Sequence, residues 1–454
     1  MMVQNPDIVI VGAGAAGIGA GLALKRLGVS HLILEAKHRV GGRAYSDTSS
    51  IGHLWDHGCH WFHSADKNVL RFMAEKIGHE FRELPHAGNM QALMNGEWTG
   101  VPVEKYFVWE LLAKISEAGR SGIDVAADEF LDRGHAWYPL IRHWCQMMYS
   151  MDPENISTGD AGNYSDSGVN LPVKAGYGAL VEKISRQLPI RLGVEVTAVE
   201  VLPKVVRVET PSGKIEAKAC IIAVPARSFE NGRIRFTPHL PKRLSQAFQD
   251  VPMGWFEKVA FAFDRPVFEN HENPFADIFD PVAGDTRPLN FELHPFGRPI
   301  AIVHAAGSVG RELLEEGEEA MKAFALENLE KAFGHGIGKR IVASAASSWG
   351  SDPFIGGAYS CAKPGRAKAR AVFSEPIHER VFLAGEHVHQ HYMATARGAY
   401  ETGLDAAHRA RNSGGLFRRA KRPALASYLI SWTFSRRLPI SAGIMINPQH
   451  RGTL

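Results

Sequence analysis

The chain has 454 residues, of which 45% are hydrophobic and 22% are charged. That composition excludes a disordered chain, and the length predicts at least two packed units. The net charge of +3 is unevenly distributed, because residues 1–405 hold all 48 acidic residues while the segment after them holds nine basic residues and no acidic one. The acidic body disfavours a nucleic-acid-binding protein, which needs a basic face.

The cysteines and the hydropathy pattern point to a reducing compartment. Cys59, Cys145, Cys220 and Cys361 form no CxxC pair, so we expect neither a disulfide framework nor a zinc site. The first predicted strand starts at residue 7, which leaves no room for a signal peptide, and no run of 18 apolar residues occurs. We therefore expect a cytoplasmic protein.

Residues 7–35 predict a strand, a glycine-rich turn, a helix and a second strand. The β-branched run at 7–11 is typical of a buried parallel strand. Gly12, Gly14 and Gly17 follow as GxGxxG, which allows a tight turn, close approach to a pyrophosphate and close packing of helix on strand. Glu35 ends the second strand, where a carboxylate accepts hydrogen bonds from ribose hydroxyls. This pattern predicts binding of FAD or NAD.

Two arginines follow within one turn. Arg39 and Arg43 flank Gly41 and Gly42. Glycines let the backbone approach a ligand, and an arginine neutralises a pyrophosphate through paired hydrogen bonds. We interpret this segment as a second part of the phosphate site.

The remaining elements predict two interleaved domains, because nucleotide-binding elements occur at both ends of the chain and in its middle. Residues 66–160 are mostly helical by their apolar spacing, and residues 190–224 alternate like a β-meander. Strands and one long helix follow in the second half. We expect that helix near 315–333, a strand at 381–385 and a last helix from about 394 to 410.

Five further blocks accompany the glycine turn in a fixed order. They are EAKHRVGGR at 35–43, DHGCHWFH at 56–63, AGYGAL at 175–180, WGSDPFIGGAYS at 349–360, and AGEHVHQHY at 384–392 followed by RGAYETG at 397–403. Together these blocks resemble the FAD-dependent amine oxidase family, and among its members they are most similar to polyamine oxidases. The resemblance covers residues 5–412 and leaves the basic tail outside.

The resemblance implies an α/β plus α+β fold, in which a Rossmann-type FAD-binding domain is interleaved with a substrate-binding domain. The FAD-binding domain would comprise residues 1–75, 170–245 and 360–412. The substrate-binding domain would comprise 76–169 and 246–359, and a basic C-terminal extension would occupy 413–454.

The resemblance also implies the residues that contact FAD. They are Gly12, Gly14, Ala15, Ala16, Gly17, Glu35, Ala36, Arg39, Gly42, Arg43, Gly58, Cys59, His60, Trp61, Val196, Val224, Trp349, Gly385, Glu386, Ala394, Thr395 and Ala396. Ala358 stands where monoamine oxidases carry the cysteine that bonds to the flavin, so the FAD should be non-covalent. The start of the last helix, at 394–396, would approach the isoalloxazine, whose negative charge when reduced suits a helix N-terminus.

Five residues are candidates for the catalytic site. By resemblance, Lys258 holds a water near flavin N5, Trp349 and Tyr359 line the amine cavity, and His63 matches the active-site histidine of animal polyamine oxidases. Thr395 stands where the family often has a second aromatic residue. The residues alone leave open a solvent-exposed Lys258, ordinary core aromatics and a structural His63. His387, His389 and His391 alternate, but no cysteine or carboxylate pattern accompanies them, so no metal site is predicted.

The implied function is oxidation of a primary or secondary amine to an imine and then an aldehyde. The first interpretation of the substrate is a polyamine-like amine. Dioxygen would be reduced to hydrogen peroxide. A flavin-dependent desaturase of the carotenoid or protoporphyrinogen oxidase type is the alternative enzyme, and a flavin-binding regulatory protein is the alternative from another class. The WGSDPFIGGAYS block and Lys258 favour the oxidase.

The basic tail has two interpretations. Its apolar stretch carries Tyr428 and Trp432 between arginine pairs. Such a segment packs on the body or on the same surface of a second copy in a homodimer, or it makes a peripheral contact with an anionic membrane.

Overall fold

The structure is a computed structural model that describes residues 5–82, 91–94, 97–100, 102–268, 275–278 and 287–413. All of these belong to one compact unit, Met1–Gly414. The predicted extension beyond residue 413 lies outside the described residues. In the described part, no helix has the length and apolar character needed to cross a membrane.

A five-stranded parallel sheet forms the nucleotide-binding half. Its order is β20 (Val381–Leu383), β13 (Ala219–Ile222), β1 (Ile8–Val11), β2 (His31–Leu34) and β9 (Ile190–Arg191). Every neighbouring pair is parallel. Strands buried on both faces need continuous apolar runs, and β1 and β13 are buried throughout. One sheet thus collects strands from three distant parts of the chain, as interleaving requires.

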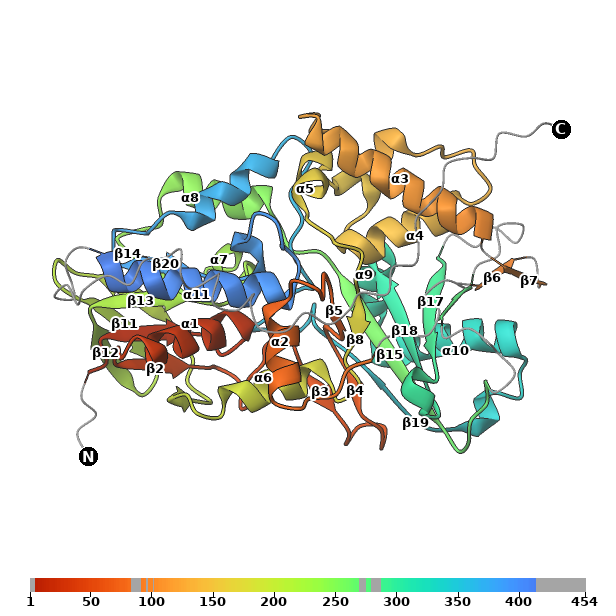
Figure 1. The fold of residues 1–454 in the computed structure, drawn as a ribbon, viewed down its shortest axis with the longest axis horizontal. Coiled ribbons are helices and arrows are strands. Elements are labelled where there is room, and N and C mark those ends of the chain that lie inside the picture. Colours follow the sequence, from red (N-terminus) through yellow and green to blue (C-terminus); the bar gives the residue numbers. More distant parts are fainter. Residues whose placement is uncertain are drawn as a thin grey trace, which may run out of the picture. The chain divides into compact units, whose positions relative to one another are not determined.

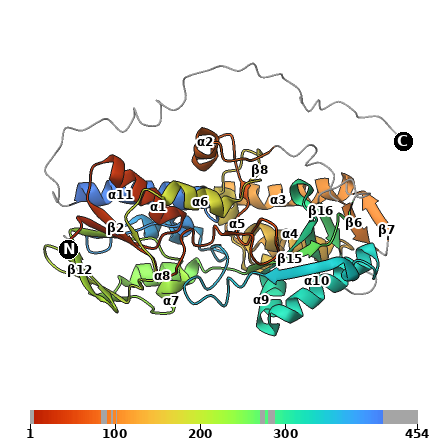
Figure 2. The same cartoon turned by 90° about the horizontal axis from the view of Figure 1, so that it is seen from below.

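Two helices from opposite ends of the sequence cover this sheet together. α1 (Ala15–Arg26) and α11 (Ala396–Asn412) lie side by side (Figures 1 and 2). Their backbones touch at glycines, since a Cβ on Gly19 would lie 2.5 Å from the Tyr400 carbonyl oxygen and one on Gly403 would lie 2.0 Å from that of Ala16. The last helix starts two residues later than predicted and packs directly against the helix of the first βαβ unit.

The predicted meander is smaller than expected. Only β10 (Ala198–Val201), β11 (Val206–Thr210) and β12 (Gly213–Ala217) form it, joined by β14 (Arg235–Thr237). The flanking β9 and β13 pair in the parallel sheet instead, and β13 is buried throughout, as expected of a strand covered on both faces.

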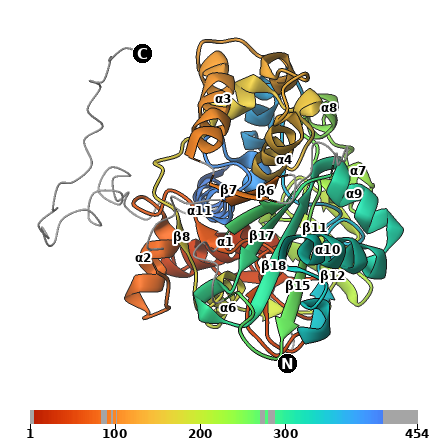
Figure 3. The same cartoon turned by 90° about the vertical axis from the view of Figure 1, so that its right-hand side faces the viewer.

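A seven-stranded mixed sheet forms the other half. Its order is β19 (Ile341–Ala346), β15 (Phe256–Phe263), β18 (Ile300–Ala306), β17 (Leu289–Leu293), β16 (Phe275–Ile278), β6 (Gln91–Met94) and β7 (Glu97–Gly100). α9 (Gly307–Glu316) and α10 (Glu318–Phe333) lie beside one face of the sheet (Figure 3). The apolar residues of that face pack against them. The single helix predicted near 315–333 is broken at Gly317, whose φ of 103° a helix cannot include.

The opposite face of the seven-stranded sheet looks toward the nucleotide-binding half, beneath α3 (Pro102–Arg120), α4 (Tyr138–Tyr149) and α5 (Thr158–Asn163) (Figure 1). The shorter elements are β3 (Ser46–Asp47), β4 (Trp55–Asp56), β5 (Trp61–Phe62), β8 (Leu171–Pro172), α2 (Val69–Lys76), α6 (Tyr177–Ser185), α7 (Arg227–Glu230) and α8 (Lys242–Asp250). The predicted α/β plus α+β organisation is observed.

Candidate active site

One cavity of about 740 Å³ runs from the β1–α1 turn to the seven-stranded sheet. Its size is within the range of sites that hold a cofactor or a substrate. The predicted residues that line it are Gly12, Gly14, Ala15, Ala16, Glu35, Ala36, Gly42, Arg43, Gly58, Cys59, His60, Trp61, His63, Val196, Val224, Lys258, Trp349, Tyr359, Gly385, Glu386, Ala394, Thr395 and Ala396. Gly17 and Arg39 are the predicted residues that do not line it.

The glycine turn shows why each glycine is there. Gly12 has φ of 100°, and a Cβ on Gly17 would lie 1.9 Å from the Gly12 carbonyl oxygen. Gly17 therefore allows α1 to pack on the turn and does not face the cavity. At Gly14 the nearest atoms to an added Cβ are 3.9 Å away, so the backbone there is open to a ligand.

The start of α1 suits an anion. No side chain caps this helix, and no acidic residue occurs in its first turn, so the free N–H groups and the positive end of the helix dipole face the cavity. Glu35 accepts hydrogen bonds from the Ala13 N–H (2.7 Å) and the Lys37 N–H (2.9 Å), and a carboxylate retains lone pairs beyond those two. These residues fit a dinucleotide such as FAD.

The two arginines have different roles. Arg39 donates to the carbonyl oxygen of Gly42 (2.8 Å), and its guanidinium lies 4.2 Å from the ring centroid of Tyr45. It therefore holds the loop and does not line the cavity, so its contact with a pyrophosphate stays a prediction. Arg43 lines the cavity and donates to Glu386 Oε1 (3.1 Å).

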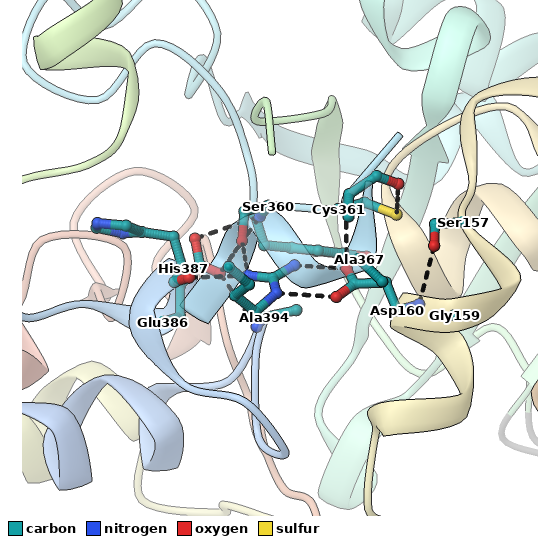
Figure 4. A network of polar contacts seen from close by, with 12 residues as sticks. Ser157, Gly159, Asp160, Ser360, Cys361, Ala367, Glu386, His387 and Ala394 are labelled. Atoms are coloured by element: carbon teal, nitrogen blue, oxygen red, sulfur yellow. Dashed lines mark hydrogen bonds and ion pairs between the residues drawn. The ribbon is translucent and has the colours of Figure 1, made fainter. Parts of the chain in front are cut away.

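A buried charge network fixes the segment that carries Glu386 (Figure 4). Arg370 is 1% exposed and donates to both carboxylate oxygens of Asp160 at 2.9 and 2.5 Å, and also to Ser360 Oγ (2.9 Å) and the His387 carbonyl (3.0 Å). Ser360 Oγ donates to Glu386 Oε2 at 2.7 Å. Burial would raise the pKa of Glu386, but Arg43, His387 and Arg370 lower it to about 2. Glu386 is therefore an anion, held by α5 as well as by its own loop.

The start of α11 is capped by a predicted site residue. Thr395 Oγ1 accepts from the Gly398 N–H (2.9 Å) and donates to the Tyr392 carbonyl (2.7 Å). The preceding Ala394 has φ of 62°, and its N–H donates to Glu386 Oε2 (3.1 Å). The cap thus connects the helix start at the cavity to the buried network.

Lys258 occupies the other end of the cavity. Its side chain is 2% exposed, so it is not an edge-strand lysine in solvent. Nζ lies 2.7 Å from the Gly58 carbonyl, 3.1 Å from the Asp56 carbonyl and 2.9 Å from His60 Nδ1. Burial lowers the pKa of Lys258 to about 8, although Asp56 and Glu292 act in the opposite direction. Near neutral pH this lysine exchanges its proton more readily than an exposed one.

Lys258 is the first member of a polar row that crosses four strands: Lys258, His304, Asn290 and Asp277. Lys258 pairs directly with His304, His304 with Asn290, and Asn290 with Asp277. His304 Nδ1 lies 3.0 Å from Asn290 Oδ1, and Asn290 Nδ2 donates to Asp277 Oδ1 (2.8 Å). Directly paired residues share a face, and the three that line the cavity are Lys258, His304 and Asn290.

Glu292 lies beside this row. His60, Glu292 and His304 each offer one ligand atom, and these atoms all lie within 4.8 Å of one another. Burial raises the pKa of Glu292 to about 7, with Lys258 acting against it. Glu292 Oε2 and His304 Nε2 have no hydrogen-bond partner among the described residues.

The remaining predicted residues form the walls. Trp349 Nε1 donates to the His57 carbonyl (3.0 Å), and the Tyr359 hydroxyl donates to the Met147 carbonyl. His63 Nδ1 contacts Asn170 Oδ1 (2.9 Å). Sequence reasoning did not find Trp109, Trp144, Met147 and Met148, which α3 and α4 contribute to the lining.

Two of the three alternating histidines have separate ring partners, whereas neither ring nitrogen of His387 has a hydrogen-bond partner among the described residues. His387 is buried, His389 Nε2 lies 3.1 Å from Glu401 Oε2, and His391 Nδ1 lies 3.1 Å from the Asn163 carbonyl. Their backbone turns through a short 3-10 helix, Glu386–Val388, so they do not share a face as alternate residues of a strand would.

The sequence matches the family model described as flavin containing amine oxidoreductase over residues 15–99 and 115–411. It is 26% identical over 444 residues to polyamine oxidase 4 of Oryza sativa subsp. japonica, covering 88% of each chain. It is 25% identical over 439 residues to lysine-specific histone demethylase 2 of Homo sapiens, covering 88% of this chain and 53% of that protein. The fold matches that of wild-type putrescine oxidase bound to putrescine with a TM-score of 0.76 at 20% identity, covering 89% of this chain and 98% of that one.

Proposed function

The chain belongs to the flavin-containing amine oxidoreductase family and is an FAD-dependent amine oxidase, and from this premise we propose how its residues carry the reaction. The observation that carries the proposal is the single cavity, which joins a dinucleotide-binding turn at one end to the buried Lys258 at the other. The substrate loses two electrons and two protons at its CH–NH group, which leaves an imine that water hydrolyses to an aldehyde or ketone and an amine or ammonia.

The nucleotide end would hold FAD without a covalent bond. The open backbone at Gly14 and the N-terminus of α1 receive the pyrophosphate, and Glu35 accepts from ribose hydroxyls. Ala358 leaves no thiol at the position that the covalent members use. The start of α11, at Ala396, would present its N–H groups to the isoalloxazine. Bound FAD supplies the two-electron acceptance that no side chain provides.

The other end would hold the amine. An aliphatic amine is mostly protonated at neutral pH and has to lose that proton before its α C–H is oxidised. Lys258, whose pKa is lowered to about 8 by burial, takes part in that proton balance or orients a water beside the reacting carbon. Trp349, Tyr359 and Phe256 form apolar walls that exclude bulk water.

We further propose that the substrate is a primary or secondary amine of the polyamine type and that dioxygen receives the two electrons, forming hydrogen peroxide with two protons. The names of the relatives support the substrate class, since they refer to polyamines, putrescine and the lysine of histones. No electron-acceptor protein is needed for this balance.

The test is an absorbance spectrum of the purified protein followed by anaerobic mixing with a panel of monoamines, diamines and polyamines. We expect a flavin spectrum that bleaches with one class of amine, and peroxide formation when air is admitted. A protein that takes up FAD but is bleached by no amine, and that instead oxidises a carotenoid or a porphyrinogen, would contradict the proposal in favour of a desaturase.

The basic tail and the location are separate proposals. We propose a cytoplasmic enzyme whose residues 413–454 pack on the body or on a second copy. If they pack on a second copy, a variant ending at Asn412 should change oligomeric size in light scattering without losing FAD, and if they pack on the body the size should stay unchanged. Loss of binding to anionic vesicles at unchanged size would support a peripheral membrane contact instead.

A further inference from the structure

The feature that the proposed function leaves unused is the polar row beyond Lys258, and in particular His304. This histidine is 5% exposed, lies on the interior strand β18 and lines the cavity. A buried polar atom without a partner is unfavourable, yet His304 Nε2 has none among the described residues. Because His304 lines the cavity, a bound molecule can supply the missing hydrogen-bond donor.

The hydrogen on His304 can be placed from its neighbours. Asp277, when ionised, only accepts, so the amide nitrogen of Asn290 faces it (2.8 Å) and Trp144 Nε1 donates to its other oxygen (3.2 Å). The amide oxygen of Asn290 therefore faces His304 Nδ1 at 3.0 Å. Nδ1 must carry the hydrogen, and Nε2 is left as a lone pair.

The charge state of His304 is also fixed by its surroundings. Burial holds the pKa of His304 well below its usual value, and Lys258 and His143 add to that effect. Burial raises the pKa of Asp277 to about 7, against the hydrogen bonds from Asn290 and Trp144. At pH 8, then, His304 is neutral and Asp277 is ionised, so the row keeps the orientation described above.

A metal ion is a poor occupant. Lys258 Nζ lies 2.9 Å from His60 Nδ1, and when the lysine donates to that nitrogen the hydrogen of neutral His60 is on Nε2, 3.6 Å from Glu292 Oε2. That nitrogen cannot bind a metal while it carries a hydrogen, and the adjacent Lys258 repels a cation when it is protonated. A ligand N–H needs only an acceptor, and His304 Nε2, on a residue that lines the cavity, provides one.

We propose that His304, oriented by Asn290 and Asp277, is an amine-binding residue that accepts a hydrogen bond from the substrate nitrogen. Because His304 is the direct cross-strand partner of Lys258, this bond holds the nitrogen next to the lysine head group. The proposal rests on the amine oxidase function above and assigns to His304 the preference of the site for primary and secondary amines, which keep an N–H, over fully substituted ones.

The test measures binding without turnover, on the FAD-loaded enzyme at pH 8. The probes are a primary amine whose α-carbon carries no hydrogen, its N-methyl derivative and its N,N,N-trimethylammonium derivative. In calorimetry, we expect the wild type to bind the first two about tenfold or more tightly than the third, as loss of one buried hydrogen bond implies.

The variant His304→Leu should bring that ratio close to one, whereas His304→Gln, which keeps an acceptor, should retain part of it. Asn290→Leu, which leaves His304 intact but frees its ring to turn, should reduce the ratio as well. A wild-type ratio near one, or a ratio that all three variants preserve, would overturn the proposal. Zn²⁺ binding that competes with the primary amine and is lost in His304→Gln would overturn it in favour of a metal site.

These outcomes are distinct from failure of the proposed function. If no amine reduces the bound flavin, the oxidase proposal fails, while the N–H dependence of binding is still measured on its own. If amines reduce the flavin of the wild type and of His304→Leu with equal kcat/KM, the oxidase proposal stands and the inference fails.

Discussion

The two ends of the cavity are built in opposite ways. At the nucleotide end, the two carboxylates already have partners inside the protein: Glu35 accepts two backbone N–H groups, and Glu386 is bonded to Arg43, Ser360 and Ala394. At the amine end, His304 lines the cavity and its Nε2 is buried with no hydrogen-bond partner among the described residues. The carboxylates of the nucleotide end are hydrogen-bonded without a ligand, whereas the amine end keeps an acceptor that a substrate can satisfy.

The difference indicates that the nucleotide end contributes to the stability of the protein and the amine end to its substrate selectivity. A satisfied buried network rigidifies its surroundings, which suits a cofactor that stays bound through many turnovers. Buried acceptors without partners cost free energy in the empty site, and a substrate that supplies donors recovers it. Variants at the nucleotide end should therefore affect folding and FAD content, and variants at the amine end should affect substrate choice.

The largest effect is expected for Gly17→Val. The first added carbon would lie 1.9 Å from the Gly12 carbonyl oxygen, so α1 could not pack on the turn. We expect little soluble protein and no bound FAD, measured by yield and absorbance. Gly336→Ala is the control, since nothing lies within 4 Å of its added carbon. FAD retained by the valine variant would show that the packing at this turn is not needed.

The next effect is expected for Asp160→Asn, which leaves Arg370 as a buried charge with its partner weakened. Removing one side of such a pair costs about 3–5 kcal/mol, and the loss should appear in both the thermal midpoint and FAD retention because Ser360 links Arg370 to Glu386. Glu75→Gln breaks an exposed pair with Arg71 and should change stability by no more than about 1 kcal/mol. Equal midpoints for the two variants would contradict the role of the network.

The Lys258→Met variant tests the amine end through the pH dependence of the unfolding free energy. Between pH 8 and about 10.4 the folded lysine is neutral while the unfolded lysine is still protonated, so the unfolded state binds more protons and wild-type stability rises with pH. The methionine variant lacks this rise, and the difference in unfolding free energy should reach about 3 kcal/mol across the window.

The same Lys258→Met variant should keep FAD but slow flavin reduction or reoxidation by about 10² or more. Urea titrations at several pH values and stopped-flow absorbance measure the two effects. Lys331→Met, at a half-exposed site on α10, should follow the wild type in both. Parallel pH curves for wild type and Lys258→Met would mean that the lysine is not buried as described.

The smallest effect is expected for Thr395→Ala, which removes the cap of α11 and costs about 1 kcal/mol. Because this cap faces the cavity, FAD affinity should fall a fewfold, as a fluorescence titration of the apoprotein would measure. Thr395→Ser keeps the hydroxyl and should restore both values. Loss of amine selectivity with FAD affinity unchanged would instead place Thr395 with the amine end.

The same contrast explains what could be predicted from the sequence. The glycine turn, Glu35 and the Gly385–Glu386 segment are local motifs whose spacing is set by one turn or one strand end, so the residues alone indicate them. Gly17 and Arg39 belong to those motifs, but Gly17 allows helix packing and Arg39 holds a loop. A sequence motif does not distinguish such roles from contact with a ligand.

The polar row could not be found in this way. Asp277, Asn290, His304 and Lys258 come from four strands, and only the strand register brings them into line. A signal was present, since each is a polar residue within a mostly apolar strand, and such residues are unfavourable unless they share a buried site. The order of strands in the sheet, which decides which of them meet, depends on contacts between distant segments.

The five-stranded sheet is built from distant parts of the chain, and this has a consequence for the biosynthesis of the protein. β1 and α1 leave the ribosome first, whereas the edge strand β20 and the covering helix α11 follow roughly 370 residues later. At about 5–20 residues per second, the nascent chain carries an incomplete nucleotide fold for about 20–70 s. FAD capture is therefore a late event in biosynthesis, and the apolar strands of β1 and β13 need protection from aggregation until the last helix arrives.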